Sequence, residues 1–581
     1  MSRTRYIQVI LPLKLDWEPY YELPEGMEVK VGDRVRVIFA NAFYVAAVSA
    51  TDVVPSLDPA RIVPVEALEQ GLPAITPEEI GFWKIVADYY LCPVGEVYKA
   101  AYPQMKNHKS RLSLPAWQSP AAGIPLSAEQ KRAADAVRAG FDTGKTVLLR
   151  GGASKLDIYL QLALETLREG RSVLLLLPEI AFSDQLVMAA KKVVPSALLY
   201  HSGMTPGKRK LVAEVLRKGE PNLVLGTRSA LFLPHHRLGL ILVDEEQDAS
   251  YKQEAPAPRY HARESAIMLA RLHGAHVLLG SGTPSLESLY NAECGRFQKV
   301  DLKESFEKEV PSRISIIDTG AEYRKKGMAG SFSLKLLEQI QQTLSDGGQV
   351  LLVGPRRTSA VGRQMEGEIL EFCPGARIAF LDGTPEDQAE TLRAFAEGEF
   401  DILLGNTLMT RGFESKKLGL AAWISTDGIL SRQDFRADER SLQLLERLRG
   451  RCRHLVIQTR APHHPVFSAL QEGNATGRLL EERRLAGYPP YSRMVRLAVR
   501  DANVKRLDFL SRELAGEMGP LGVPVEGPYP SLREENLREI RLLLPRDKSL
   551  TARKTAIGQT VTAFEQARKY TGHIAIDVDP A

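Results

Sequence analysis

Two successive series of short apolar segments, separated by helical patterns, most constrain the fold of this 581-residue chain. The first series lies between residues 126 and 291 and comprises TVLLRG, SVLLLLP, NLVLGT, LGLILVDEE and HVLLGSGTPS; the second lies between residues 334 and 463 and comprises QVLLVG, ARIAFLD, FDILLGN, LAAWIST and HLVIQT. Segments that are apolar throughout are typical of parallel strands covered by helices on both faces. We therefore predict two doubly wound α/β lobes in tandem, each with its ligand site at the C-terminal strand ends. Two such lobes are the outline of a nucleic-acid motor.

Different patterns flank the predicted lobes. Short strand-like runs broken by turn signals, such as YIQVILPL and DRVRVIFA, predict a β-rich domain over residues 1–105, with a helix in PEEIGFWKIVADYYLC. Residues 106–125 contain prolines and serines without periodicity and are typical of a linker. The lobes then take residues 126–310 and 311–485. Residues 486–581 follow the order strand, helix, strand, strand, helix, strand, which predicts a ferredoxin-like α+β domain.

The composition excludes several classes of protein. With 44% hydrophobic and 25% charged residues and a formal charge of +5, the chain has an ordinary globular composition that permits a polyanionic partner without requiring one. It has no apolar run near 18 residues, so we expect no membrane span and a cytoplasmic location. The four cysteines lie roughly 80 or more residues apart without a C-x-x-C pair, so we expect neither bound zinc nor any other metal site, nor a disulfide framework.

An ordered set of short motifs extends over nearly the whole chain. In sequence order these are LSAEQ, YHSGM, GTRSALFLP, LILVDEEQDASYKQEAPAPRYHARE, GSGTPSLES, GNTLMTRGF, DFRADERSLQLLERLRGRCRH, AGYPPYSR and IDVDP. The set resembles the PriA family of replication-restart proteins, which are superfamily 2 DNA helicases. The resemblance implies an N-terminal domain that binds DNA 3′ ends, two RecA-like lobes and a C-terminal domain. It also implies recognition of abandoned replication forks, with the single-stranded DNA-binding protein and the other primosome proteins as partners.

The phosphate-binding loop departs from this family. After the strand TVLLRG the family has G-V-T-G-S-G-K-T-E, whereas this chain has GGASKLD, with Gly151, Gly152 and Lys155. The loop is two residues shorter, which removes up to about 7 Å of contour at about 3.3–3.6 Å per residue. Leu156 replaces the threonine that would bind Mg²⁺. We prefer a plain strand–turn–helix corner over an unusual nucleotide loop, so ATP and Mg²⁺ should bind weakly at most and no cofactor is assigned.

Other nucleotide-site motifs are partly retained. Gln130 precedes the first lobe, where a glutamine can recognise an adenine edge. Asp244 and Glu245 would hold Mg²⁺ and orient the attacking water, or they have a structural role. The family has G-R-A-G-R, whose last arginine stabilises the γ-phosphate; in GRCRH, Arg451 is kept and Arg453 is displaced by one position. Loss of such an arginine, called an arginine finger, lowers the rate of nucleotide hydrolysis by about 10³–10⁵-fold. The alternative interpretation of both arginines is surface charge.

The DNA-facing motifs are better retained. In GTRSALF, hydroxyl, guanidinium and backbone donors at a strand end can bind phosphates. In SYKQEAPAPRYHAR, tyrosines can stack on bases and cations can hold the backbone, unless the segment is an ordinary polar loop packed on the lobe. The candidate DNA-binding residues are Thr227, Arg228, Ser229, Tyr251, Lys252, Arg259, Tyr260 and Arg263.

Two modules of the family have no counterpart in the sequence. The zinc domain with eight cysteines would follow Arg356-Arg357, but the chain continues directly to the next strand, and the short linker leaves no room for a winged helix. The family's F-D-Y is Pro19-Tyr20-Tyr21 and its P-F-G is Ile38-Phe39-Ala40, so the aspartate that would contact a terminal sugar is absent.

These departures define the functional hypothesis. We expect a PriA-like primosomal protein that binds forked or single-stranded DNA in replication restart without ATP-driven unwinding, using the helicase fold as a scaffold. The alternative is an active ATP-dependent 3′–5′ DNA helicase with an unusual nucleotide loop. A third reading is a helicase-derived protein with a new partner.

Overall fold

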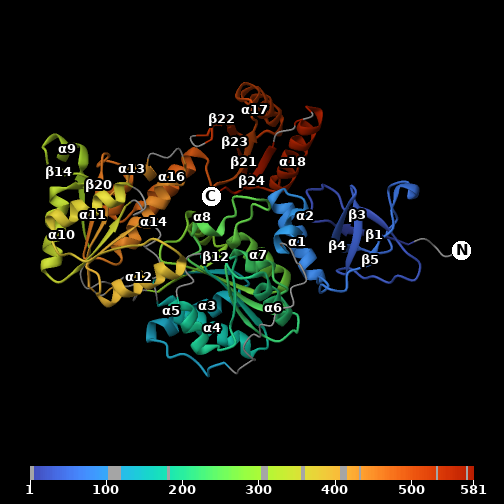
Figure 1. The fold of residues 1–581 in the computed structure, drawn as a ribbon, viewed down its shortest axis with the longest axis horizontal. Coiled ribbons are helices and arrows are strands. Elements are labelled where there is room, and N and C mark those ends of the chain that lie inside the picture. The colour runs from blue at the N-terminus through green and yellow to red at the C-terminus, as the bar shows by residue number, and fades with distance from the viewer. Residues whose placement is uncertain are drawn as a thin grey trace.

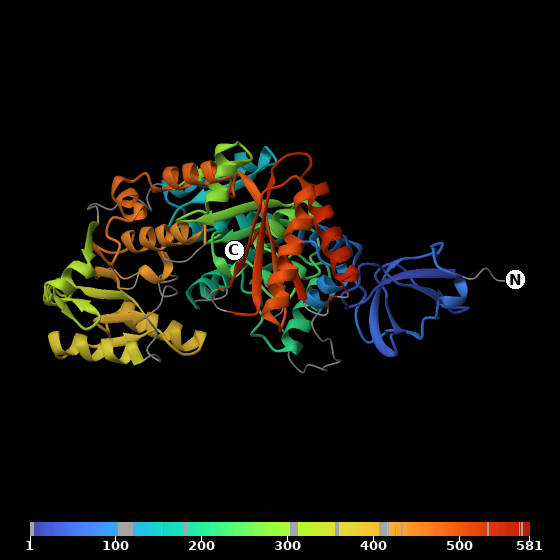
Figure 2. The same ribbon diagram turned by 90° about the horizontal axis from the view of Figure 1, so that it is seen from above.

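The computed structural model describes residues 5–102, 120–152, 154–178, 184–302, 312–354, 360–405, 415, 417–424, 426–430, 434–531, 534–568, 570 and 573–580. Residues 103–119, which include most of the predicted linker 106–125, lie outside the described residues, as do the pair Arg356-Arg357 and the motif NTLMTRGF after Gly405. Figure 1 shows four units: a β-rich N-terminal unit, two α/β lobes side by side, and a C-terminal unit packed over the first lobe. In the turned view of Figure 2, the second lobe lies at one end of the long axis and the N-terminal unit at the other, with the first lobe and the C-terminal unit between them. The predicted fold class is confirmed.

The N-terminal unit is a five-stranded antiparallel sheet in the order β2-β1-β4-β3-β5. Its strands are β1 (Arg5–Ile10), β2 (Tyr20–Leu23), β3 (Arg34–Phe39), β4 (Ala42–Ala50) and β5 (Ala67–Leu68), with the short 3₁₀ helix η1 (Pro59–Arg61) between β4 and β5. Alternate residues such as Val35 and Val37 point inward to an apolar core. The predicted helix is α1 (Pro77–Tyr90); it begins at a capping box in which Thr76 and Glu79 satisfy each other's backbone amides. Helix α2 (Val94–Ala101) follows.

The first lobe has a seven-stranded parallel sheet in the order β12-β6-β11-β10-β7-β9-β8. Its strands are β6 (Thr146–Arg150), β7 (Ser172–Leu176), β8 (Leu198–Tyr200), β9 (Leu223–Gly226), β10 (Leu238–Asp244), β11 (His276–Ser281) and β12 (Phe297–Asp301). Its helices are α3 (Ala128–Asp142), α4 (Lys155–Arg168), α5 (Asp184–Val193), α6 (Pro206–Leu216), η2 (Arg228–Phe232), η3 (Ala249–Tyr251), α7 (Ala262–His273) and α8 (Leu286–Glu293). The central strands are buried on both faces, as their continuous apolar sequence predicted.

The second lobe has a six-stranded parallel sheet in the order β13-β20-β19-β16-β18-β17. Its strands are β13 (Arg313–Asp318), β16 (Gln349–Val353), β17 (Ile378–Phe380), β18 (Ile402–Gly405), β19 (Leu418–Trp423) and β20 (His454–Thr459), and β14 (Met328–Ala329) and β15 (Phe332–Ser333) form a small hairpin. Its helices are α9 (Thr319–Arg324), α10 (Leu334–Ser345), α11 (Ala360–Phe372), α12 (Pro385–Glu397), α13 (Asp427–Leu430), α14 (Ala437–Arg449), α15 (Pro465–Glu472) and α16 (Ala475–Ala486).

The C-terminal unit is an antiparallel sheet in the order β22-β23-β21-β24. Its elements are β21 (Ser492–Arg500), α17 (Val504–Met518), η6 (Gly519–Leu521), β22 (Val525–Pro530), β23 (Leu537–Pro545), α18 (Leu550–Ala567) and β24 (His573–Val578). The predicted βαββαβ order and the pairing of the first strand with the third and fourth make the domain ferredoxin-like. Strand β24 forms one edge of this sheet, and α1 packs beside it.

Candidate functional site

The corner between β6 and α4 uses its hydrogen-bond donors within the protein. The Gly151 amide donates to the Ser281 carbonyl of β11 at 3.0 Å, and the Lys155 amide donates to the Gly152 carbonyl at 3.3 Å. The Lys155 ammonium turns back and donates to the Gly151 carbonyl at 2.9 Å, and this residue is only 4% exposed. A phosphate-binding loop instead directs its amides and its lysine at the ligand. At this corner the lysine and these two amides bond to the protein itself.

The Lys155 ammonium forms a buried cluster with the carboxylates at the end of β10. It lies 3.0 Å from Glu245 Oε1 and 3.8 Å from Asp244 Oδ1. The Tyr159 hydroxyl donates to Asp244 at 3.0 Å, and the Gln247 amide donates to Glu245 at 2.7 Å. The structure thus brings together three predicted residues, Lys155, Asp244 and Glu245. Sequence reasoning missed Tyr159, although its position four residues after Lys155 places both side chains on one face of α4.

The electrostatics of this cluster follow from burial and mutual charge. Burial raises the pKa of Asp244 to about 6, against the opposing effect of Lys155. Burial also raises the pKa of Glu245, but the charges of Lys155 and Arg447 outweigh it and hold that pKa at about 2. Burial lowers the pKa of the Lys155 ammonium, and the facing Glu245 and Asp244 more than offset this, so the pKa lies above its ordinary value. At neutral pH the cluster thus holds two carboxylates against one ammonium, and the charge of Arg447 also acts on Glu245.

Two further residues near the corner serve packing and capping. Leu156 packs against the apolar core between α4 and the first-lobe sheet, so the position of the family's threonine holds no oxygen for Mg²⁺. Gln130 was predicted to recognise adenine, but its side chain is engaged within the protein. Its oxygen accepts from the Ser127 amide at 2.8 Å, and its nitrogen donates to the Ser154 carbonyl and to Asp157. Gln130 thereby caps α3 and fastens it to the start of α4.

A second-lobe arginine that was not predicted acts on the cluster. Arg447, in the last turn of α14, contributes its charge to Glu245 and Lys155. Of the two predicted arginines, Arg453 is exposed, and Arg451 lies in the turn after α14 with its backbone amide bonded to the Leu448 carbonyl. The family pattern gave no signal for Arg447, because it precedes the G-R pair from which the finger was predicted.

The predicted phosphate contacts after β9 are partly buried. Thr227 is 3% exposed, and its hydroxyl lies 3.4 Å from that of Ser229. Arg228 donates to the Ser250 carbonyl at 2.6 Å, which ties η2 to η3. These three residues lie together at the C-terminal end of β9, where a parallel sheet places its ligands. Their role in DNA binding stays a prediction.

The stacking role predicted for two tyrosines does not agree with the structure. Tyr251 is 1% exposed, and its hydroxyl donates to the Leu176 and Asp244 carbonyls at 3.0 and 2.6 Å. Tyr260 is 2% exposed and packs edge-on against Phe232 at 5.1 Å between ring centroids. Neither ring has a free face for a base, because both pack into the core of the first lobe. The alternative, a polar loop packed on the lobe, fits this part of the segment.

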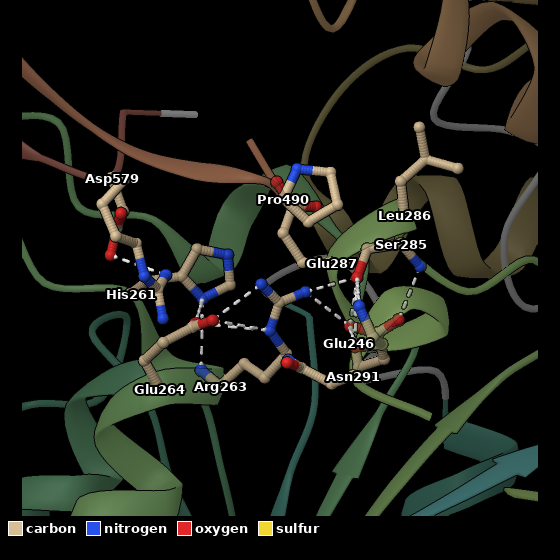
Figure 3. A network of polar contacts seen from close by, with 12 residues as sticks. Glu246, His261, Arg263, Glu264, Ser285, Leu286, Glu287, Asn291, Pro490 and Asp579 are labelled. Carbon is tan, nitrogen blue, oxygen red and sulfur yellow. Dashed lines mark hydrogen bonds and ion pairs between the residues drawn. The ribbon is translucent and has the colours of Figure 1, made fainter. Parts of the chain in front are cut away.

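The cations of the same segment also bond within the protein. Lys252 forms an ion pair with Asp577 of β24 at 2.8 Å, and Arg259 donates to the Ile576 carbonyl at 3.5 Å. Arg263 on α7 lies within a buried network that includes Glu246 and Ser285 at 2.6 Å each and Glu264 at 2.8 Å (Figure 3). Glu246, which the sequence reasoning missed, also accepts from the Ser285 amide at 2.7 Å. Arg263 is thus a structural residue in this state of the molecule.

The network continues across the two lobes. At the start of α8, the Leu286 amide donates to Glu439 of the second lobe at 2.9 Å. Glu287 of the first lobe forms an ion pair with Arg436 at 2.6 Å, and Glu439 pairs with Arg483 at 2.6 Å. Residues of the lobes and of the C-terminal unit, including Arg436 and Arg493, line a cavity of about 70 Å³ here. We call Glu287, Arg436, Glu439 and Arg483 the lobe junction.

Two exposed aromatic rings lie near the predicted DNA pocket of the N-terminal unit. The Tyr21 hydroxyl donates to the Ile38 carbonyl at 3.0 Å, and Ala40 and Asn41 adopt positive φ in the tight β3–β4 turn. Trp17 is 50% exposed and Phe43 is 74% exposed. Exposed rings on a β-sheet suit base stacking. Sequence reasoning missed both residues.

The part of the chain that the structure describes contains neither a clustered set of metal-ligating side chains nor a membrane-spanning helix. No group of three or more His, Cys, Asp or Glu side chains could hold a metal ion there. Nor is any helix in the described ranges long and apolar enough to cross a bilayer.

Two tandem parallel-sheet lobes, with paired carboxylates at a strand end of the first, define a helicase-like protein. Residues 8–103 match the sequence model of the 3′DNA-binding domain of PriA, and residues 484–581 match that of the primosomal protein N C-terminal domain. The chain belongs to the PriA family of replication restart proteins.

Individual relatives agree with this assignment. The replication restart protein PriA of Rickettsia prowazekii is 27% identical over an alignment of 666 positions that covers 99% of each chain. Because this chain has only 581 residues, the alignment contains gaps, and the residues of the relative opposite these gaps have no counterpart here. The PriA of Bacillus subtilis is 30% identical, with 68% of this chain and 58% of that protein covered. Among solved structures, RecG bound to a three-way DNA junction aligns with a TM-score of 0.39 and 17% identity over 62% of this chain and 46% of that chain.

Proposed function

We propose that this protein binds forked or single-stranded DNA in replication restart and does so without ATP-driven unwinding. The first part is supported by the two PriA-specific domain matches and by relatives named as replication restart proteins. In this proposal residues 1–105 capture DNA, residues 126–310 and 311–485 form a scaffold joined to the first unit by the linker 106–125, and residues 486–581 form a separate docking unit. The single-stranded DNA-binding protein and the primosome proteins stay predicted partners.

One observation carries the second part of the proposal. The Lys155 ammonium is buried between Glu245 at 3.0 Å, Asp244 at 3.8 Å and the Gly151 carbonyl at 2.9 Å. ATP would need this lysine for its β- and γ-phosphates, and Mg²⁺ would need the carboxylates together with a hydroxyl. Extracting Lys155 would leave two half-buried carboxylates without their cation, and Leu156 offers no compensating oxygen. The geometry therefore favours an internal ion pair over a nucleotide complex.

Capture of DNA by the N-terminal unit is supported by its exposed rings. Trp17 and Phe43 offer apolar faces to solvent, and base–aromatic stacking contributes about 1–3 kcal/mol per base. The sequence lacks the aspartate of the family pocket, so we propose stacking without strict selection of the terminal sugar.

The test measures ATP hydrolysis and fork binding on the same purified protein. We expect salt-dependent fork binding, and hydrolysis at background level with or without DNA. Replacing both rings (Trp17→Ala with Phe43→Ala) should weaken fork binding by roughly 10-fold or more, because two stacking contacts are lost. The exposed Val54→Ala variant is the control for loss of apolar surface from the same unit.

The competing function is an active 3′–5′ helicase, which the retained pair Asp244 and Glu245 favours. DNA-stimulated hydrolysis that Lys155→Ala abolishes would establish this alternative and refute the scaffold proposal. Absence of fork binding in the unmodified protein would refute the DNA-binding part.

A further inference from the structure

Residues Ile576–Pro580, at the end of β24 and just beyond it, bond to every other part of the molecule. We call this stretch the C-terminal latch. From the first lobe, Arg259 donates to the Ile576 carbonyl at 3.5 Å and Lys252 pairs with Asp577 at 2.8 Å. Tyr89 of α1 donates to Asp579 at 2.7 Å, and Arg436 of the second lobe donates to the Pro580 carbonyl at 3.4 Å.

Lys252 is the most completely enclosed of these partners. Its side chain has no exposed surface, and its ammonium lies 2.7 Å from the Arg259 carbonyl, 2.7 Å from the Val578 carbonyl and 2.8 Å from Asp577. Two of its three N–H donors bond to the Arg259 and Val578 carbonyls, and the Asp577 carboxylate lies at ion-pair distance as its counterion. Tyr90 covers a further side, with its ring centroid 5.4 Å from the ammonium nitrogen. While the latch is seated, Lys252 cannot contact any ligand.

The latch presents a row of acceptor oxygens to the two cations. Lys252 and Arg259 face one carboxylate, that of Asp577, and two neutral carbonyl oxygens along an extended strand. A nucleic-acid backbone likewise repeats acceptor oxygens along an extended chain, and lysine and arginine are the usual partners of its anionic phosphates. The two cations lie in the segment whose composition predicted DNA binding.

We propose that the C-terminal latch is an internal acidic ligand that covers a phosphate-binding surface formed by Lys252 and Arg259, and that single-stranded DNA competes for this surface. This proposal rests on the proposed function of DNA binding. It adds a second, concealed DNA contact to the exposed one on the N-terminal unit.

Asp577→Asn tests the proposal by removing the charge that holds Lys252. The substitution keeps the size of the side chain but leaves a buried ammonium without its counterion, which favours release of the latch. Each newly exposed cation that binds a phosphate steepens the dependence of log K on log salt by about 0.7 for single strands. We therefore expect tighter binding of a single-stranded oligonucleotide at low salt and a slope steeper by about 1.4. Adding Lys252→Met and Arg259→Met should restore the original slope.

Glu534→Gln is the matched control. It makes the same change of charge in the same domain, but Glu534 pairs with Arg500 at the surface, away from the latch. The affinity of the Glu534→Gln variant for the single-stranded oligonucleotide, and the salt dependence of that affinity, should differ little from those of the unmodified protein. Equal gains in Glu534→Gln and Asp577→Asn would overturn the proposal, since they would reflect net charge alone.

Hydrogen exchange of the unmodified protein provides a second test that needs no substitution. Saturating single-stranded DNA should increase exchange of the β24 amides, because the strand leaves its seat. Unchanged exchange in a protein that does bind DNA, or an unchanged slope in Asp577→Asn, would overturn the latch and leave the proposed function intact. Failure of the unmodified protein to bind any DNA would instead refute the proposed function.

Discussion

At the scale of single residues, Lys155 should matter for stability rather than for turnover. Lys155→Ala removes the cation between Asp244 and Glu245 and leaves two half-buried carboxylates, with side chains 15% and 27% exposed, without their counterion. Because solvent screens part of this charge, we expect a loss of about 1–3 kcal/mol in the free energy of unfolding, which urea denaturation measures. Lys145→Ala is the control, because this exposed lysine of the TGKT turn should cost less than about 0.5 kcal/mol. Equal stability of the two variants would contradict the structural role of Lys155.

The contacts of a residue could be predicted where its partners are near in sequence or lie at neighbouring strand ends. Contacts with residues far away in the sequence could not be predicted. The grouping of Lys155 with Asp244 and Glu245 follows from the parallel sheet, whose strand ends meet at one edge. Burial of Lys252 depends on Asp577, more than 300 positions away, and no local pattern marks that pairing. The same holds for Arg263, whose polar surroundings are assembled from α7, α8 and the end of β10. A segment rich in cations and tyrosines therefore suggested an exposed surface, whereas in the fold its tyrosines are buried and the C-terminal unit covers Lys252 and Arg259.

At the scale of elements, the segment between η2 and β10 should make the first lobe sensitive to acid. His235 is buried, its Nε2 lies 2.8 Å from the Ala230 carbonyl, and burial lowers its pKa to about 4 from an ordinary value of 6.5. The folded state therefore binds this proton less readily than the unfolded state. Stability is fully present above pH 6.5 and is lost as the pH falls to about 4, by about 3 kcal/mol.

Denaturation as a function of pH checks this expectation. His235→Gln should reduce the decline of the unfolding free energy between pH 6.5 and 4 by up to about 3 kcal/mol, whereas His236→Gln, at an exposed neighbour, should keep it. A decline of the same size in all three proteins would show that His235 does not control it.

Strands inside the sheets were easier to predict than strands at the edges. The sequence patterns identified all the interior strands of both lobes, because these are apolar on both faces. They missed β8 and β12, the two edges of the first sheet, and β13, an edge of the second. In β12 three of the five side chains are exposed, so FQKVD carries no continuous apolar signal. Edge strands have a neighbouring strand on one side only, so they tolerate polar side chains that face solvent.

At the scale of the whole molecule, the lobe junction should set the angle between the lobes. Arg436 pairs with Glu287 of the first lobe at 2.6 Å and donates to Pro580 of the C-terminal unit at 3.4 Å. Arg436→Met should therefore broaden the distribution of distances between the lobes. Arg440→Met is the control, since Arg440 pairs with Asp434 in its own segment at 2.8 Å.

Spin labels report this distribution directly. Cysteines introduced at the exposed Met188 and Val361 place one label on each lobe, in a background where the exposed Cys294 is replaced by serine. A narrow distribution in Arg436→Met, equal to that of Arg440→Met, would show that other contacts hold the lobes.

The architecture at this scale was predictable in its parts but not in their arrangement. The four units follow from periodicity and from the order of strands and helices, which are local properties of the sequence. Their relative placement depends on pairs such as Arg436 with Glu287, and each such pair joins residues from different units. No spacing rule connects these positions, so the seat of the C-terminal unit on the first lobe emerged only from the structure.

The position of β24 also bears on self-association. A strand at the edge of a sheet presents unpaired backbone groups that can recruit a strand from another chain and so begin aggregation. On the outer edge of β24, the carbonyls of Ile576 and Val578 accept from Arg259 and Lys252 and are no longer open to such pairing. The two side chains thus protect the molecule from adding copies of itself along this edge, as inward-pointing charges do on other β-sheets.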